Sequence, residues 1–254
     1  MKAILKLCYI IYEICIALPI ILVATILTAI TTIVGGILGN SDFWGYYPGM
    51  IWSRIICKVL LLPVSMSGLE YIEKGKPYIV IPNHQSIFDI FLLYGYIGIK
   101  FKWMMKKELE RIPLVGAACR KAGFIYIERG SKSGSRESMA ETEKTLSRGM
   151  SMIIFPEGTR TADGKIGRFK KGAFLLSEEL GIPLLPVTIN GAYQVMSRHA
   201  RLVTWHPLSF TVHKAIEPES TEGLTPVELN AKMRETAAHA ASVIESALNQ
   251  SETL

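Results

Sequence analysis

Residues 78–89 read YIVIPNHQSIFD, and this stretch predicts a buried strand that turns directly into a helix. The apolar run Tyr78–Ile81 is typical of a strand inside a sheet, and Pro82 ends it because proline has no backbone N–H to donate. Ser86 followed three residues later by Asp89 resembles a capping box, with Ser86 as the residue that caps the helix. The chain is therefore expected to pass from strand to helix through one tight turn.

His84 and Asp89 are the first candidates for chemistry in this stretch. On one continuous helix, positions five apart point about 140° away from each other, so they would not meet. With His84 in the turn and Asp89 in the first helical turn, the carboxylate can reach the imidazole and fix its tautomer. The other ring nitrogen is then free to act as a base. Taken alone, the same two residues could equally be a turn residue and a helix cap.

Alternating strands and helices continue through the rest of the chain, which predicts an α/β fold with a mostly parallel sheet flanked by helices. Strands are expected at residues 78–81, 101–105, 124–127, 152–155 and 184–189, and helices at 86–94, 113–122, 135–147 and 171–180. Residues 202–205 and 209–213 are expected to form an antiparallel pair. A terminal helix is expected at 225–248, opened by a capping box.

The N-terminal part is expected to be embedded in a membrane. Residues 14–38 carry no charge, and this run exceeds the ~20 residues that a helix needs to cross a bilayer. Hydrophobic content is 49% and the mean hydropathy is +0.28. The pattern predicts a membrane-embedded helical segment over residues 1–62 and an α/β domain over 63–254. The helices either cross the membrane once or form a hairpin in one leaflet.

Basic residues are concentrated in the middle of the chain. The net charge is +6, and residues 100–171 hold 17 Lys and Arg against 8 Asp and Glu. Such a patch suits phosphorylated ligands or an anionic membrane, and no nucleic-acid motif accompanies it, so no nucleic-acid partner is expected. The four cysteines have no CxxC spacing, which favours reduced thiols in a reducing compartment and argues against a metal site.

Three further strand ends place charged side chains beside the first turn. Residues 153–160 read IIFPEGTR, where Arg160 can hold a phosphate with two hydrogen bonds and Glu157 is expected to hold Arg160, a hydroxyl or a turn amide. Residues 123–129 end in Arg129, and Lys106 follows the strand at 101–105. Each stretch alone could be a solvated turn. Because the carboxyl ends of parallel strands share one edge of a sheet, we expect these side chains to ring a single cleft.

Together these stretches resemble the glycerolipid acyltransferase family that carries a His-x4-Asp motif, most closely its 1-acyl-sn-glycerol-3-phosphate acyltransferases. Residues 83–89 resemble the first motif of that family and residues 123–129 the second, with Glu128 where the family often has Asp. Residues 155–160 resemble the third motif, and the sequence IPLLPV at 182–187 resembles the fourth. The match covers residues 67–189, about half of the chain.

The resemblance implies a membrane-bound enzyme of phospholipid biosynthesis. An acyl chain would move from a thioester donor, acyl-CoA or acyl-carrier protein, to the sn-2 hydroxyl of lysophosphatidate, giving phosphatidate. His84 would be the general base and Asp89 its orienting partner, with backbone amides of the turn stabilising the oxyanion. The implied substrate-binding residues are Lys106, Arg129, Glu157, Gly158, Thr159 and Arg160. No cofactor or metal is implied. The catalytic domain is expected on the cytoplasmic face of a phospholipid membrane.

Two alternative functions stay open from the sequence. The acceptor could be glycerol 3-phosphate, a lysophospholipid or a lyso-aminolipid instead of lysophosphatidate. A second alternative is a non-catalytic protein that binds anionic lipid through its basic patch. An α/β-hydrolase nucleophile is disfavoured because the sequence has no Gly-x-Ser-x-Gly elbow.

Overall fold

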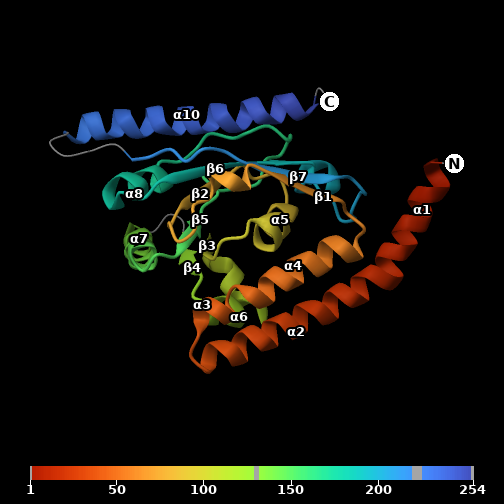
Figure 1. The fold of residues 1–254 in the computed structure, drawn as a ribbon. Helices are drawn as coiled ribbons and strands as arrows, with labels where there is room; N and C mark the ends of the chain where they lie inside the picture. The colour runs from red at the N-terminus through yellow and green to blue at the C-terminus, as the bar shows by residue number, and fades with distance from the viewer. Residues whose placement is uncertain (1, 129–131, 219–224, 253–254) are drawn as a thin grey trace.

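A sheet of seven strands forms the centre of the molecule in the residues that the structure, a computed structural model, describes: 2–128, 132–218 and 225–252 (Figure 1). The strands lie in the order β1-β7-β6-β2-β5-β3-β4. Their bounds are β1 Val64–Ser67, β2 Ile79–Pro82, β3 Phe101–Lys106, β4 Ile125–Ile127, β5 Ser151–Ile153, β6 Leu184–Asn190 and β7 Leu208–Val212.

The sheet is mostly parallel, as the sequence predicts. Strands β6, β2, β5, β3 and β4 all run in one direction, and β7 pairs antiparallel with β6. Val80 of β2 pairs with Ile153 of β5, which in turn pairs with Trp103 of β3. The ends of these three strands therefore lie at one edge of the sheet, next to one another.

Two details of the predicted sheet are wrong. Residues 202–205 form no strand, and β7 pairs with β6 and with β1 in their place. In the structure the 202–205 segment contacts the N-terminal part: Trp205 Nε1 donates a hydrogen bond to the Leu61 carbonyl at 2.7 Å, and the Val203 N–H donates to Glu13 Oε1 at 2.9 Å. Strand β1 is not among the predicted strands, and its residues are largely exposed.

Helices cover both faces of the sheet (Figure 1). One face carries α7, α8 and α10, and the other carries α5, over which α4 and then α2 are packed. The helices are α1 Lys2–Tyr12, α2 Leu18–Ile37, α3 Ser41–Trp44, α4 Tyr47–Val59, α5 Phe88–Tyr96, α6 Val115–Lys121, α7 Lys132–Ser147, α8 Gly172–Leu180, α9 Ala192–Val195 and α10 Pro226–Glu252. The predicted capping box of the terminal helix is present, with the Thr225 N–H donating to Glu228 Oε2 at 2.8 Å.

The N-terminal helices form one long apolar rod. Helices α1 and α2 are joined by a π-helical turn, η1, over Glu13–Ala17, in which the Leu18 N–H donates to the Glu13 carbonyl. Pro19 follows this turn and has no N–H to give to the ordinary helical partner, which explains the change of register there. Within the described residues, one helix, Ile4–Ile37, is long and apolar enough to cross a membrane.

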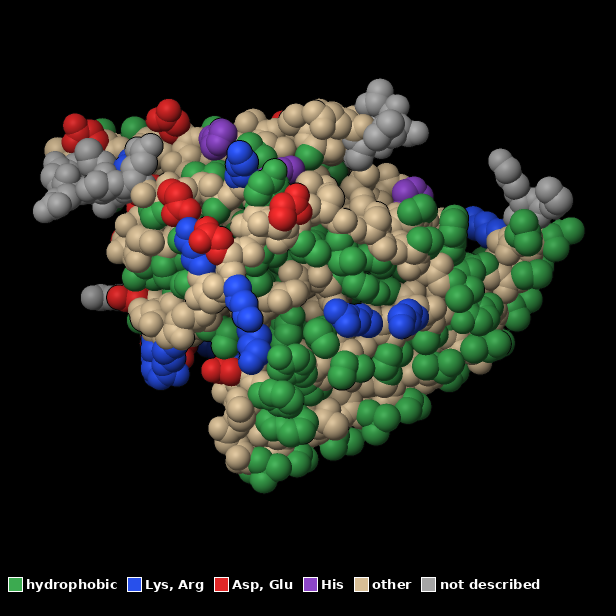
Figure 2. All heavy atoms as spheres, in the orientation of Figure 1, with side chains coloured by type: hydrophobic (Ala, Val, Ile, Leu, Met, Phe, Trp, Pro, Cys, Tyr) green, Lys and Arg blue, Asp and Glu red, His purple; other side chains and the backbone are tan. Residues whose placement is uncertain are grey.

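The outer face of this rod is exposed and apolar. Only 11% of the most apolar stretch of this helix is buried against the rest of the protein, so it is not a core helix. Figure 2 shows the resulting hydrophobic band, which runs over α2 and α4 with a few basic side chains among the apolar ones. Gly35 lets this rod fold back on α3, because a Cβ there would collide with the Trp44 ring. The expected division at residue 62 between a membrane segment and the α/β domain stays a prediction. In the structure α4, which precedes residue 62, packs into the same buried core as α5.

Candidate active site

The turn after β2 is held firmly at its first residue. Asn83 is fully buried, and its side chain makes two hydrogen bonds to β6: Nδ2 donates to the Ile189 carbonyl at 2.9 Å, and Oδ1 accepts the Ile189 N–H at 2.7 Å. This pair replaces the ladder hydrogen bonds that end at Pro82. His84 follows immediately and therefore projects from a fixed point at the edge of the sheet.

His84 and Asp89 meet across the turn. His84 Nδ1 lies 2.7 Å from Asp89 Oδ2; the Asp89 side chain is fully buried and the His84 side chain is 16% exposed. A buried carboxylate at Nδ1 favours the tautomer with a proton on that nitrogen and a lone pair on Nε2. Oδ2 also accepts the N–H groups of Gln85 at 2.7 Å and Ser86 at 2.8 Å. The arrangement is suited to a base whose ring is oriented by a carboxylate.

The capping pattern at Ser86 is only partly as predicted. The Ser86 N–H does donate to Asp89, but the Ser86 hydroxyl donates to the Met196 carbonyl at 2.6 Å and accepts the Phe88 N–H at 3.3 Å. The hydroxyl thus ties the start of α5 to the loop after α9. Because the Gln85 and Ser86 amides are already bound to Asp89, they are not available to stabilise an oxyanion.

Glu157 binds turn amides, one of the three partners expected for it. Its Oε1 accepts the His84 N–H at 2.7 Å, and its Oε2 accepts the Gly167 N–H at 2.7 Å. The residue is 6% exposed, and this burial raises its pKa to about 7, although the two amides act in the opposite direction. Both oxygens are used within the chain, so Glu157's place in the substrate-binding set stays a prediction.

The buried carboxyl of Glu157 makes stability depend on pH. Its pKa rises from 4.5 to about 7 on folding, so its contribution to stability is complete below pH 4.5 and is lost as the pH rises to about 7. Over this window the wild type should lose up to about 3 kcal/mol of unfolding free energy relative to Glu157→Gln, which cannot titrate. Urea unfolding in detergent at a series of pH values measures this difference. If the unfolding free energy of the two proteins changed with pH in parallel, the raised pKa of Glu157 would be contradicted.

Two of the three predicted cations, Lys106 and Arg160, lie at the same edge of the sheet as His84. Lys106 is the last residue of β3, which is separated from β2 by β5 alone, and its side chain is exposed. Arg160 is half-buried and Thr159 exposed, in the turn that follows β5. Arg129 lies outside the described residues; the strand before it, β4, pairs in parallel with β3. Among the described residues, no ion pair involves Lys106 or Arg160.

Lys170 is a further cation at this edge that the sequence analysis does not identify. Its N–H donates to the Pro156 carbonyl at 2.8 Å, which brings the 165–170 loop back over the turn after β5. Gly158 has φ +71°, and a Cβ on it would lie 2.8 Å from Lys170 Nζ. Glycine at 158 therefore serves both the left-handed turn and the close approach of the ammonium group. No short motif contains Lys170, because the eleven residues 159–169 separate it from Pro156–Gly158.

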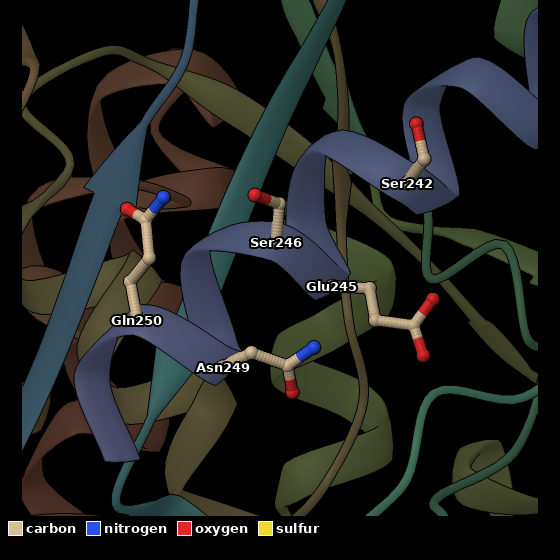
Figure 3. Close-up of a pocket in the computed structure, with 5 residues that line it drawn as sticks. All are labelled: Ser242, Glu245, Ser246, Asn249 and Gln250. Atoms are coloured by element: carbon tan, nitrogen blue, oxygen red, sulfur yellow. The ribbon is translucent and has the colours of Figure 1, made fainter. Parts of the chain in front are cut away.

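A surface pocket on α10 lies away from His84. Figure 3 shows a pocket lined by Ser242, Glu245, Ser246, Asn249 and Gln250, all from α10. Helix α10 packs on the face of the sheet opposite α5, so this pocket is separated from His84 by the sheet. Within the described residues, no group of three or more His, Cys, Asp and Glu is placed to hold a metal ion.

Comparison with known proteins assigns the family. A family model described as Acyltransferase matches residues 63–190, about half of the chain. The chain belongs to the acyltransferase family. Its match spans β1 to β6 and so includes the His84 turn, the turn after β5 and Lys170. The expected family and the expected α/β fold are both confirmed.

Named relatives of the chain are 1-acyl-sn-glycerol-3-phosphate acyltransferases. A chloroplastic one from Arabidopsis thaliana is 30% identical over 163 residues, which cover 63% of this chain and 46% of the relative. The alpha form from Mus musculus is 32% identical over 169 residues, covering 66% of this chain and 59% of the relative. This acyltransferase-family chain thus spans about half the length of the curated relatives that it matches.

A solved structure matches nearly the whole chain. The 1-acyl-sn-glycerophosphate (LPA) acyltransferase PlsC from Thermotoga maritima aligns with a TM-score of 0.72 and 26% sequence identity. The alignment covers 95% of this chain and 97% of the PlsC chain, so it extends well beyond residues 63–190.

Proposed function

We propose that this chain transfers an acyl group from a thioester donor to the sn-2 hydroxyl of 1-acyl-glycerol 3-phosphate, forming phosphatidate. The observation that carries the proposal is the His84–Asp89 pair, 2.7 Å apart, at a sheet edge where Lys106, Arg160 and Lys170 also lie. A base beside several cations suits an acceptor that has both a hydroxyl and a phosphate. The names of the relatives and of the structural neighbour favour the same acceptor.

By analogy with the family, the proposed transfer is direct, without a covalent acyl-enzyme. His84 Nε2 takes the proton of the acceptor hydroxyl, and the oxygen attacks the thioester carbonyl. As the tetrahedral intermediate collapses, the C–S bond breaks and the departing thiolate receives the proton from the imidazolium. Asp89 stabilises the imidazolium between these two proton transfers, as a buried carboxylate at Nδ1 does in other base–carboxylate pairs.

The acceptor is proposed to be reached from a lipid surface. Its own acyl chain favours a bilayer, and the exposed apolar face of α1 and α2 gives the chain a matching surface. Because α4 packs on α5, and α5 begins at the active-site turn, the membrane helices and the dyad are joined through two layers of packing. The proposed location of the dyad is the cytoplasmic side of the membrane.

An acyl-transfer assay tests the proposed reaction. Purified chain in phospholipid vesicles is given lysophosphatidate, glycerol 3-phosphate, a neutral lysophospholipid or a lyso-aminolipid, each with acyl-CoA and with acyl-carrier protein as donor. We expect turnover to be fastest with lysophosphatidate. Preferred acylation of another acceptor would replace the proposed substrate, and no turnover with any pair would refute the reaction.

Loss of a cation at the site should weaken binding of the phosphate. Arg160→Ala and Lys170→Ala are each expected to raise KM for lysophosphatidate roughly 10- to 100-fold, the equivalent of one lost hydrogen bond between charged groups. Steady-state kinetics with monoacylglycerol, which has no phosphate, should show no such rise. The matched control is Lys74→Ala, since Lys74 is exposed at the opposite end of β2. Equal effects on both acceptors would rule out a phosphate contact.

A further inference from the structure

Two aromatic rings are stacked behind the His84 imidazole. The Phe155 ring lies on the His84 imidazole with a centroid distance of 3.8 Å and an angle of 17° between the planes. Trp103 lies on the other side, with its ring 5.9 Å from that of Phe155 at 14°. Trp103 is 4% exposed and belongs to the central core, so Phe155 rests against a fixed support.

The segment that contains Phe155, residues 155–161, also binds the backbone N–H and the backbone carbonyl of His84. The His84 N–H donates to Glu157 Oε1 at 2.7 Å, and the His84 carbonyl accepts the Thr161 N–H at 2.9 Å. Residues 155–161 therefore contact the ring face, the N–H and the carbonyl of a single residue. All three contacts come from the turn after β5, which is the neighbour of β2 in the sheet.

We propose that the 155–161 segment is a positioning device for His84, and that Phe155 positions the imidazole by stacking on it. This inference rests on the proposed function and adds a role to a segment otherwise expected to bind substrate. Asp89 holds the ring at Nδ1 only, which leaves the ring plane free to tilt about that hydrogen bond. A flat neighbour at stacking distance removes this freedom and thus fixes the direction of the Nε2 lone pair.

Stacking also favours the charged form that the reaction creates. When Nε2 takes the hydroxyl proton, the imidazolium lies over the Phe155 face, where a cation is attracted by the ring quadrupole. Leucine has a similar apolar character but no flat face and no quadrupole. Replacing Phe155 with leucine should therefore keep the packing largely filled while removing the stack.

The kinetic test compares Phe155→Leu with Phe155→Tyr, which keeps the ring. We expect Phe155→Leu to lower kcat roughly 10- to 100-fold, with KM for both substrates little changed, because a misdirected base slows the chemical step. Phe155→Tyr should restore most of kcat. The matched control is Phe124→Leu: Phe124 is also half-buried but precedes β4, which β5 and β3 separate from β2, and it packs against Tyr94.

A spectroscopic test reads the stack without any turnover. In protein labelled at the histidine ring carbons, ring current from Phe155 should shift the His84 ring protons upfield, and the signal is identified by its loss in His84→Gln. The shift should disappear in Phe155→Leu and persist in Phe155→Tyr and Phe124→Leu. Phe155→Met serves as a second ring-free variant if thermal unfolding shows that Phe155→Leu is not folded.

The outcomes separate this inference from the proposed function. A wild type that shows the ring-current shift but no acyl transfer would refute the proposed reaction. A wild type that turns over, with an unaffected kcat in folded Phe155→Leu, would overturn the positioning role alone. A rise in KM for the acyl donor with kcat unchanged would also overturn it, since it would make Phe155 a substrate contact.

Discussion

Replacing His84 with alanine is expected to lower kcat for acyl transfer by about three orders of magnitude, the middle of the range for losing a general base. The structure gives the reason: the His84 imidazole is 16% exposed, is oriented by a fully buried carboxylate, and projects from a turn held by Asn83. Initial rates with lysophosphatidate and a thioester donor in vesicles measure the effect.

The control for His84→Ala is attachment to lipid. The exposed apolar face of α1 and α2 is untouched by the substitution, so flotation with phospholipid vesicles should be unchanged. If the chain were a non-catalytic protein that binds anionic lipid, neither lipid binding nor any measured function would depend on His84. Charge reversals among the basic residues of the 100–171 segment would then abolish lipid binding. Retained turnover in folded His84→Ala would remove the base from the mechanism.

The contact between His84 and Asp89 could be predicted from sequence because its geometry is local. A buried strand, a proline and a helix start lie within residues 78–89, and these alone bring His84 and Asp89 together. The parallel direction of the strands also followed from their apolar pattern, and it places the turns after β2 and β5 at the same edge of the sheet. That the two strands are neighbours was not predicted. Local pattern and sheet direction together were enough to bring the candidate residues to one edge of the sheet.

What could not be predicted depends on contacts between distant segments. Lys170 reaches Gly158 only because its loop folds back, and Phe155 reads as an ordinary strand residue until its ring is seen on His84. Residues 202–205 have the composition of a strand but contact Glu13 in the N-terminal rod and Leu61 in the turn after α4. None of these partners is near in sequence, so spacing carries no signal for them.

Asp89→Asn should lower kcat by about 100-fold or more while leaving the turn intact. In the wild type, Oδ2 accepts all three hydrogen bonds, from His84, Gln85 and Ser86, while the buried Oδ1 has no partner among the described residues. An asparagine oxygen can take the place of Oδ2 and keep all three. The reverse orientation would direct an NH₂ group at two N–H donors, which is unfavourable. The substitution therefore removes mainly the charge that stabilises the imidazolium.

Asp89→Ala is the informative contrast, because it removes the charge and the hydrogen bonds together. It leaves the Gln85 and Ser86 amides without their acceptor at the buried start of α5. The free energy of unfolding should therefore fall by about 2–4 kcal/mol. Asp89→Asn should lose less stability but nearly as much kcat. Comparing kcat with urea unfolding for the two variants separates the electrostatic role from the structural one. A fully active Asp89→Asn would show that orientation alone suffices and that the negative charge contributes little to the reaction.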